Sequence, residues 1–388
     1  MVTTTALMNT YGERKLTLVK GEAMYLWDDQ GRRYLDALSG IAVCGLGHSH
    51  PKLVAAISEQ AGTLMHISNL YNTEPSVRLA ELLRSLTAME NVFFSNSGAE
   101  ANEAALKIAR KYGNDQGIKT PTVITMNGSF HGRTMATLTA TGNPKVKEGF
   151  APLLDGFIHV DYNDIDAVKA IDNDQVVAIL VEPVQGEGGV NIPADDYLCE
   201  LRAICDERNW LLMLDEIQTG NGRTGELFAF QHTNIVPDVV TTAKGLGNGL
   251  PIGACMAYGK AAEVLKPGNH GSTYGGNPLV CHGAYTVLTT LQEERLIENA
   301  KQVGNYLLQG FQQQLENHAK VKNIRGKGMM IGIELTQACA ELVGAAADKG
   351  LLLNVTAGST IRLLPPLITS EADADQMIDI VCQLINEL

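Results

Sequence analysis

The chain has 388 residues, 45% of them hydrophobic, and its 30 Lys and Arg against 43 Asp and Glu give a formal net charge of −13. This length exceeds the usual limit of a single hydrophobic core, so we expect two domains with room for a site between them. The acidic balance, which has no block of like charge, argues against nucleic acids and anionic membranes as main partners.

Residues 1–8 have neither a basic start nor a long apolar stretch, and no later segment approaches 18 uninterrupted apolar residues. The seven cysteines are scattered without a CxxC pair, which is typical of a reducing compartment. We therefore expect a soluble, cytoplasmic protein. His48 and His50 could suggest a metal, but no acidic or cysteine partner follows at ligand spacing, so no metal site is predicted.

Along the chain, short apolar runs without alternation predict buried strands; these are residues 92–94, 122–125, 176–181, 211–214 and 239–241. Such runs are covered on both faces, which indicates a central, mainly parallel sheet. Helices are expected between or after them at residues 99–112, 197–208 and from 278 into 292 and beyond. The pattern predicts an α/β fold with helices flanking the sheet.

The two ends of the chain differ from its middle. Residues 10–45 carry short strand-like pieces and turns, and the chain from about residue 275 mixes long helices with a strand-like run at 329–334. We predict a large domain at residues 46–274 and a smaller, discontinuous α+β domain made of residues 1–45 and 275–388.

Ligands of a parallel sheet lie at the carboxyl ends of its strands, so the residues that follow each run are candidate site residues. Lys244 follows the run at 239–241 and opens a glycine-rich turn, and Asp215 ends the run at 211–214. Pyridoxal phosphate needs both groups, because its aldehyde condenses with a lysine amine and its ring nitrogen pairs with a carboxylate. Alone, Lys244 would more often be a solvated surface group.

Small residues follow the strand at 92–94 and lead directly into a helix. Ser97, Gly98 and Ala99 would expose backbone N–H groups at the positive end of that helix, which suits a phosphate. Ser97 followed by Glu100 is also an ordinary capping box, and the two interpretations are compatible.

Three further turns carry candidates. Phe130 could stack on a cofactor ring and Arg133 could bind a carboxylate, although a core phenylalanine and a surface arginine are the plain alternatives. Glu182 and Glu216 follow buried runs directly, and both could be structural hydrogen-bond acceptors.

Taken in order, five motifs resemble those of the class III, fold type I, pyridoxal-phosphate-dependent aminotransferases, over nearly the whole chain. They are residues 97–103 (SGAEANE), 129–134 (SFHGRT), 182–189 (EPVQGEGG), 215–220 (DEIQTG) and 244–253 (KGLGNGLPIG). Residues 19–28, 67–75 and 271–278 are similar to the acetylornithine aminotransferases of arginine biosynthesis, although relatives acting on ornithine or succinylornithine share much of them.

This resemblance implies a transaminase that moves the δ-amino group of N2-acetylornithine to 2-oxoglutarate, giving N-acetylglutamate 5-semialdehyde and glutamate. It implies cofactor contacts from Ser97, Gly98, Ala99, Phe130, Asp215, Gln218, Lys244 and Thr273. Lys244 would be the covalent anchor and proton carrier, and Gln218 would face the ring hydroxyl. Thr273 would reach the phosphate from the other subunit of a homodimer. Ala99 departs from the threonine of many relatives, which removes one possible phosphate contact.

The resemblance also implies substrate-binding residues. Arg133 would bind the distal carboxylate in both half-reactions, and Arg362 would bind the carboxylate beside the reacting carbon of glutamate. Glu187 would pair with Arg362 when that carboxylate is absent. Tyr11 and Ser272 are further candidates, and Asn69 and Tyr71 join Tyr11 as possible contacts to the acyl group.

Alternatives stay open. The chain could prefer free ornithine, succinylornithine or succinyldiaminopimelate, and the pattern does not decide the oligomeric state beyond a dimer. A racemase or aminomutase on the same scaffold would keep Lys244 and Asp215 without needing 2-oxoglutarate, whereas a non-catalytic binding protein would not form the covalent link to the cofactor.

Overall fold

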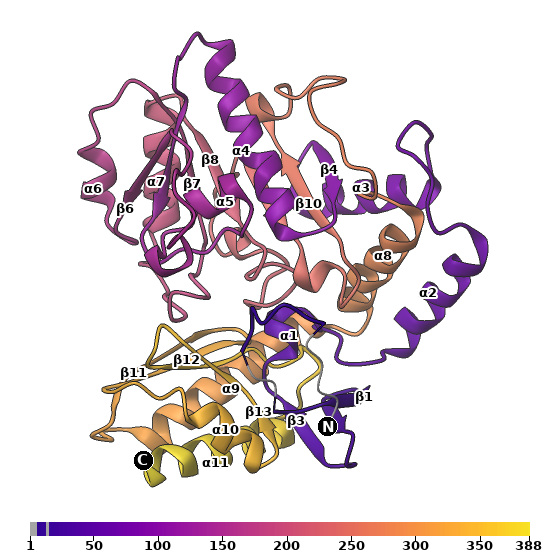
Figure 1. Cartoon of the computed structure of the whole chain (residues 1–388), viewed down its shortest axis with the longest axis vertical. Coiled ribbons are helices and arrows are strands. Elements are labelled where there is room, and N and C mark those ends of the chain that lie inside the picture. The colour runs from indigo at the N-terminus through magenta and orange to yellow at the C-terminus, as the bar shows by residue number, and fades with distance from the viewer. Residues whose placement is uncertain (1–5, 13–14) are drawn as a thin grey trace.

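A computed structural model describes residues 6–12 and 15–388 of the chain. Within them, a seven-stranded sheet of order β4-β10-β9-β8-β7-β5-β6 forms the upper lobe in Figure 1. Its strands are β4 (Asn91–Ser95), β5 (Thr122–Met126), β6 (Phe157–Val160), β7 (Val176–Val181), β8 (Leu211–Asp215), β9 (Val239–Thr242) and β10 (Gly253–Ala257). Only β10 runs antiparallel to its neighbours β4 and β9, which confirms the mainly parallel sheet.

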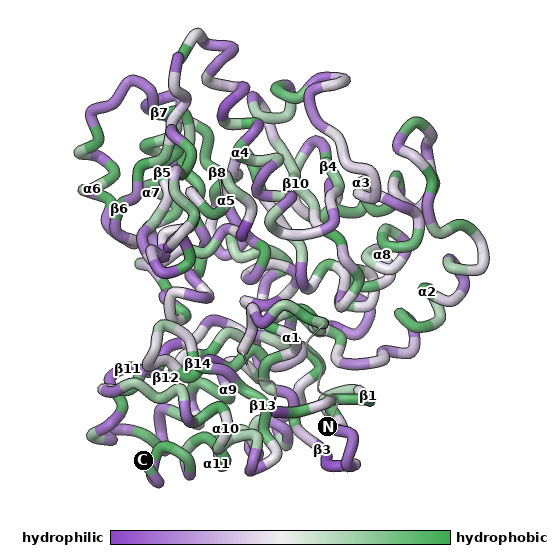
Figure 2. Tube along the Cα trace, viewed as in Figure 1, coloured by the Kyte–Doolittle hydropathy of each residue, from purple (hydrophilic) through white to green (hydrophobic). Residues whose placement is uncertain are grey.

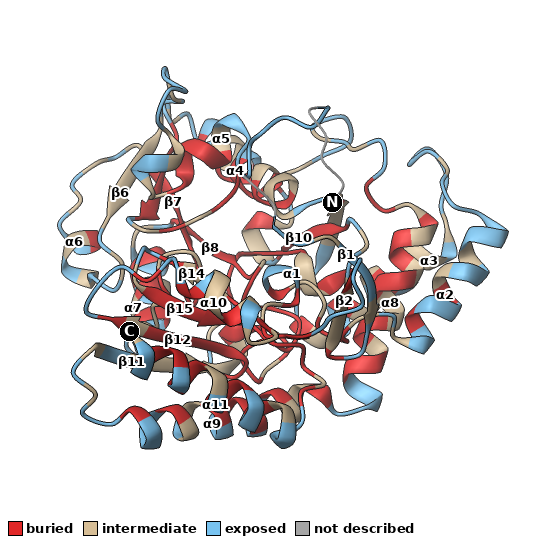
Figure 3. Cartoon of the chain, turned by 60° about the horizontal axis from the view of Figure 1, so that its bottom comes forward, coloured by how far each residue is buried: buried red, intermediate tan, exposed pale blue. Residues whose placement is uncertain are grey.

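Helices cover both faces of this sheet, because successive strand residues point to opposite sides. In β8, Leu211 and Met213 pack with α4, while Leu212 and Leu214 belong to the core that contains α7. Figure 2 shows the apolar strands inside the lobe, and Figure 3 shows their burial. The helices of this lobe are α2 (Pro51–Thr63), α3 (Glu74–Thr87), α4 (Gly98–Asp115), α5 (Met135–Ala140), α6 (Ile165–Lys169), α7 (Tyr197–Glu207) and α8 (Pro278–Glu293).

Segments from both ends of the chain share the lower lobe of Figure 1. One sheet has the order β1-β2-β3-β13 and the other β11-β12-β15-β14. Their strands are β1 (Leu18–Glu22), β2 (Tyr25–Asp28), β3 (Arg33–Asp36), β11 (Val321–Lys327), β12 (Met330–Leu335), β13 (Leu351–Leu352), β14 (Asn354–Thr356) and β15 (Thr360–Leu363), and the helices are α1 (Ser39–Ala42), α9 (Leu296–Leu315), α10 (Leu342–Asp348) and α11 (Glu371–Glu387). The parallel pair of β3 with β13 ties the two ends of the chain together.

Helix α8 connects the two lobes, and it packs on α2 and α3 as well as on α9. The helix therefore contacts elements on both sides of the boundary predicted at residue 274, and that boundary stays a prediction. Among the residues that the structure describes, no helix is long and apolar enough to cross a membrane.

Candidate active site

A cavity of about 370 Å³ lies at the carboxyl ends of β7, β8 and β9. Its wall brings together most of the residues predicted from the motifs. They are Ser97, Gly98, Ala99, Phe130, Arg133, Glu187, Asp215, Gln218 and Lys244, joined by others that include Val43, Asn96, His131 and Glu182. This is the edge at which a mainly parallel sheet binds ligands.

Lys244 lies two residues after the end of β9 and has a strained backbone conformation. Its φ is +43°, a left-handed value that a residue with a side chain rarely adopts, and such outliers cluster at functional sites. Burial lowers the pKa of its amine from 10.5, opposed by the negative charges of Glu187 and Asp215. A buried amine with a depressed pKa releases its proton more readily, as a nucleophile or proton carrier must.

Asp215, the last residue of β8, is held by three donors. Its Oδ2 accepts hydrogen bonds from Asn102 Nδ2 at 2.7 Å and from His131 Nδ1 at 2.8 Å, and its Oδ1 accepts one from the backbone N–H of Ile217 at 3.1 Å. The side chain is 3% exposed. Hydrogen bonds of this kind stabilise the ionised carboxylate, which suits a partner for a protonated ring nitrogen.

The start of α4 forms the opposite wall. Ser97 is the N-cap, and its Oγ accepts the backbone N–H of Glu100 at 3.2 Å. A side chain at Gly98 would bring its Cβ within 2.7 Å of Ile217, so only glycine lets the loop approach the turn after β8 this closely. The positive end of α4 thus faces the cavity beside Asp215, in the arrangement that binds phosphate.

An ion pair between the buried Arg362 and the partly exposed Glu187 lies on the side of the cavity that faces the small sheets. Arg362 Nη1 donates to Glu187 Oε1 at 2.6 Å and to Gln218 Oε1 at 3.3 Å, and Gln218 Nε2 donates to Glu187 Oε1 at 3.3 Å. Burial would raise the pKa of Glu187, but the guanidinium of Arg362 lowers it below 4.5 overall. A Cβ on Gly186 would lie 1.9 Å from Gln218 Oε1, so the loop needs glycine there.

One nitrogen of the Arg362 guanidinium has no hydrogen-bond partner among the described residues. Its side chain is fully buried and its Nε donates to Asn354 Oδ1 at 3.2 Å, yet within the described part of the chain Nη2 has no hydrogen-bond partner. An unpaired buried N–H is costly and suits an acceptor brought in by a ligand. Arg133 differs, because it is exposed at the rim of the cavity, where its guanidinium lies 5.6 Å from the centre of the Phe130 ring.

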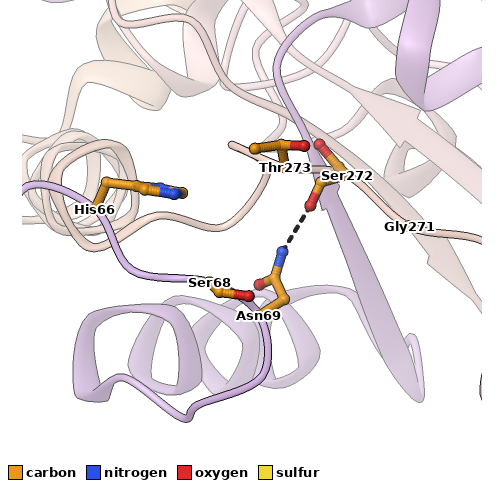
Figure 4. A pocket seen from close by; sticks show the side chains of 6 residues that line it. All are labelled: His66, Ser68, Asn69, Gly271, Ser272 and Thr273. Atoms are coloured by element: carbon orange, nitrogen blue, oxygen red, sulfur yellow. Dashed lines mark hydrogen bonds between the residues drawn. The ribbon is translucent and has the colours of Figure 1, made fainter.

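Arg362 does not line this cavity itself but bonds Glu187, which does, and Tyr11, Ser272 and Thr273 do not line it either. Tyr11 is 81% exposed, and Ser272 and Thr273 line a separate cavity of about 320 Å³ shown in Figure 4, where Asn69 Nδ2 donates to Ser272 O at 2.9 Å. Asn96 links the two cavities, since its Nδ2 donates to Ser272 Oγ at 3.3 Å. A role for Thr273 in another subunit's site stays a prediction.

The sequence reasoning missed Asn102. It occupies the buried face of α4 together with Ala101, Ala105 and Ala109, and none of these side chains is exposed. A single amide on an otherwise apolar helix face was the signal for a polar partner in the core. Among the described residues, no group of three or more His, Cys, Asp or Glu side chains is arranged to hold a metal ion.

Comparison with known proteins decides the family. The family model for class III aminotransferases matches residues 8–385. The chain belongs to the class III aminotransferases. It is 58% identical over 381 residues to the acetylornithine aminotransferase of Nitrosomonas europaea, covering 98% of this chain and 97% of that protein.

Two solved structures of such aminotransferases share the fold. The acetylornithine aminotransferase of Elizabethkingia anophelis is 35% identical with a TM-score of 0.89, covering 98% of this chain and 96% of that chain. A structure of the ornithine aminotransferase of Toxoplasma gondii, with partial occupancy of pyridoxal phosphate at its active site, is 33% identical with a TM-score of 0.93, covering 97% and 91%. The predicted fold type I aminotransferase architecture is therefore confirmed.

Proposed function

We propose that the protein is an acetylornithine aminotransferase, which moves the δ-amino group of N2-acetylornithine to 2-oxoglutarate in arginine biosynthesis. The observation that carries the proposal is the common cavity of Lys244, Asp215 and Glu187, with the buried Arg362 bonded to Glu187. Relatives of 45% to 58% identity over nearly the whole chain bear that name.

The residues around this cavity fit pyridoxal phosphate. A buried amine at Lys244, a carboxylate fixed by three donors at Asp215, and the N-terminus of α4 are the groups that its aldehyde, ring nitrogen and phosphate require. When bound, this cofactor supplies an amino-group carrier and an electron sink for the negative charge at the reacting carbon. Ser97, Gly98, Ala99, Phe130 and Gln218 would complete its contacts.

Lys244 would hold the cofactor and afterwards carry the proton. Burial favours the neutral form of this amine. Once released from the cofactor, the amine would take a proton from the substrate carbon and pass it to a carbon of the cofactor. The three hydrogen bonds to Asp215 stabilise its carboxylate form, which would favour a positive charge on the ring nitrogen.

The Glu187–Arg362 pair addresses a problem that the two substrates create. The carbon of acetylornithine that reacts carries no carboxylate, whereas that of glutamate has one beside it. With acetylornithine bound, Glu187 would neutralise Arg362; with glutamate, the substrate carboxylate would replace Glu187. This exchange avoids a buried, uncompensated charge that would cost several kcal/mol. Arg133 at the rim would bind the distal carboxylate in both cases.

The proposal extends to a cytoplasmic homodimer that acts on small molecules only. All seven cysteines are free, which fits a reducing compartment. Thr273 lies outside the Lys244 cavity, so it would reach a phosphate only in the other subunit. Ser272 and Tyr11 would then join the substrate site from that side.

The test is a comparison of amino donors under the same conditions. Glutamate formation from 2-oxoglutarate would be measured with N-acetylornithine, ornithine, N-succinylornithine and succinyldiaminopimelate. The largest kcat/KM is expected for N-acetylornithine. A larger value for ornithine would assign the protein instead to ornithine aminotransferases, which are also among its structural neighbours. Specificity among these donors rests on differences of about 1–3 kcal/mol.

A further inference from the structure

Two carboxyl groups share the inner wall of the cavity. Glu182 directly follows β7 and Asp215 ends β8, and the parallel register pairs Val181 with Leu214, so the two side chains emerge side by side. Both line the cavity and are almost fully buried, at 6% and 3% exposure. Two neighbouring buried carboxylates repel each other, which favours a proton on one of them.

Hydrogen-bond donors are divided unequally between the two groups. Asp215 accepts three, from Asn102, His131 and the backbone of Ile217. Glu182 accepts one, the backbone N–H of Phe130 at 3.1 Å. Because each donor stabilises the charged form, this division favours ionisation of Asp215 and protonation of Glu182.

The orientation of the Asn102 amide is fixed by its own partners. Its Nδ2 donates both to Asp215 Oδ2 at 2.7 Å and to the backbone carbonyl of His131 at 2.8 Å, and a carbonyl can only accept. The other side of the amide, Oδ1, accepts the hydroxyl of Thr241 at 2.7 Å. The carbonyl of His131 therefore keeps the amide nitrogen on the side of Asp215, while Thr241 on β9 pairs the amide oxygen.

We propose that Asn102, oriented by the His131 carbonyl and supported by Thr241, is a positioning residue that assigns the negative charge of this carboxyl pair to Asp215 and leaves Glu182 as a neutral acid. The inference rests on the proposed function, because it concerns the charge that faces the cofactor ring. Burial first, and the charge of Asp215 next, raise the pKa of Glu182 well above 4.5, against the opposing effect of Lys244. Besides Lys244, the titratable groups around the pair include Glu187, Glu216, His131 and Tyr162.

The assignment matters for the ring chemistry. An ionised Asp215 stabilises a proton on the ring nitrogen and so strengthens the electron sink. If the charge moved to Glu182, Asp215 would be protonated and would donate to the nitrogen instead. Asn102 thus acts on the reaction through Asp215 without touching the cofactor.

The experiment uses the full-length protein and four variants: Asn102→Ala, Glu182→Gln, the double variant of these, and Thr241→Val. Glutamine has the shape and neutrality of a protonated glutamate, so Glu182→Gln should bind pyridoxal phosphate within about threefold of wild type. Asn102→Ala loses a hydrogen bond to a charged group and should bind it about 10- to 100-fold more weakly, with a shifted pH profile of cofactor absorbance. Thr241→Val should shift the profile in the same direction.

The double variant separates charge assignment from general damage. With Gln at position 182, no second carboxyl group competes for the negative charge, so Asp215 should stay ionised even without Asn102. The double variant should therefore regain about half or more, on a logarithmic scale, of the cofactor affinity that Asn102→Ala loses. Additive losses in the double variant would overturn the proposal. So would a tenfold loss in Glu182→Gln alone, because Glu182 would then need its negative charge.

Asn221 provides a matched control. It is a buried asparagine that also bonds a threonine hydroxyl of β9, since its Nδ2 donates to Thr242 Oγ1 at 2.9 Å, yet it does not bond Asp215. Asn221→Ala should not shift the absorbance profile, and Glu182→Gln should not rescue any affinity it loses. Rescue there would contradict the proposal. Circular dichroism of each variant verifies that it folds.

A measurement on the cofactor-free protein tests the charge assignment without the cofactor. The infrared difference spectrum of the cofactor-free wild type minus Glu182→Gln at neutral pH should contain the band of one protonated carboxyl group. A difference made of carboxylate bands alone would overturn the assignment. Neither this spectrum nor cofactor affinity needs a substrate, so a wild type that binds the cofactor without transferring an amino group would contradict only the proposed function.

Discussion

The buried guanidinium of Arg362 donates a hydrogen bond to Glu187 Oε1 at 2.6 Å. Glu187 comes from the loop after β7 and Arg362 from β15, so the pair joins the large sheet to one of the small sheets at the cavity. An ion pair whose cation is fully buried and whose anion is 32% exposed at the cavity side can exchange its anion for a ligand carboxylate.

Glu187→Gln tests this exchange. The variant keeps the shape of the side chain but leaves Arg362 without a counter-charge when acetylornithine is bound. When glutamate is bound, the neutral Gln does not compete with the substrate carboxylate for Arg362. We expect the rate of the acetylornithine half-reaction to fall about tenfold or more, and that of the glutamate half-reaction to change little. Rapid-mixing absorbance of each half-reaction gives both rates, and equal losses would rule the exchange out.

Arg133→Gln should behave differently from a change at Arg362. Arg133 is proposed to bind the distal carboxylate of both substrates, so the variant should weaken kcat/KM for N-acetylornithine and for 2-oxoglutarate alike, by about 10- to 100-fold. Arg362→Gln should mainly impair the glutamate and 2-oxoglutarate side. If Arg133→Gln affected one substrate only, its proposed role would be wrong.

Lys244→Met should stabilise the cofactor-free protein. Burial lowers the folded-state pKa of Lys244 below 10.5, so folding releases a proton between these two pKa values, and at lower pH the buried ammonium costs free energy. This cost grows as the pH falls from 10.5 and levels off below the folded pKa. The melting temperature of Lys244→Met should therefore exceed that of wild type at pH 7, and the difference should shrink towards pH 10. A gain that increased with pH would contradict this explanation.

His48→Asn should destabilise the protein in a pH-dependent way. The hydrogen bond of His48 Nε2 with Asp36 Oδ2 at 2.8 Å, aided by Cys44, raises the pKa of His48 to about 9. A raised folded-state pKa contributes stability that is complete below about pH 6.5 and lost as the pH rises through 9. Urea unfolding should show the largest loss at pH 6 and little loss at pH 9.5, and a loss independent of pH would exclude the charge of His48 as the cause.

The sequence predicts the positions of Lys244 and Asp215 well because both follow short buried strands, and the ends of parallel strands meet at one edge of the sheet. The pairing of Glu187 with Arg362 could be proposed only from the family resemblance, since the two residues lie 175 positions apart. Asn102 was missed because a helix sequence does not reveal which buried neighbour its amide meets. Gln218 lines the cavity and its side chain bonds Glu187 and Arg362, and its expected contact with a cofactor hydroxyl stays a prediction.

The most direct test of the central claim is a single half-reaction. Purified protein loaded with pyridoxal phosphate would be mixed with N-acetylornithine, and separately with ornithine, each without 2-oxoglutarate, while the absorbance of the loaded enzyme is followed. We expect fast conversion to the absorbance of pyridoxamine phosphate with N-acetylornithine, slow conversion with ornithine, and none in Lys244→Met. No conversion with N-acetylornithine, or faster conversion with ornithine, would contradict it.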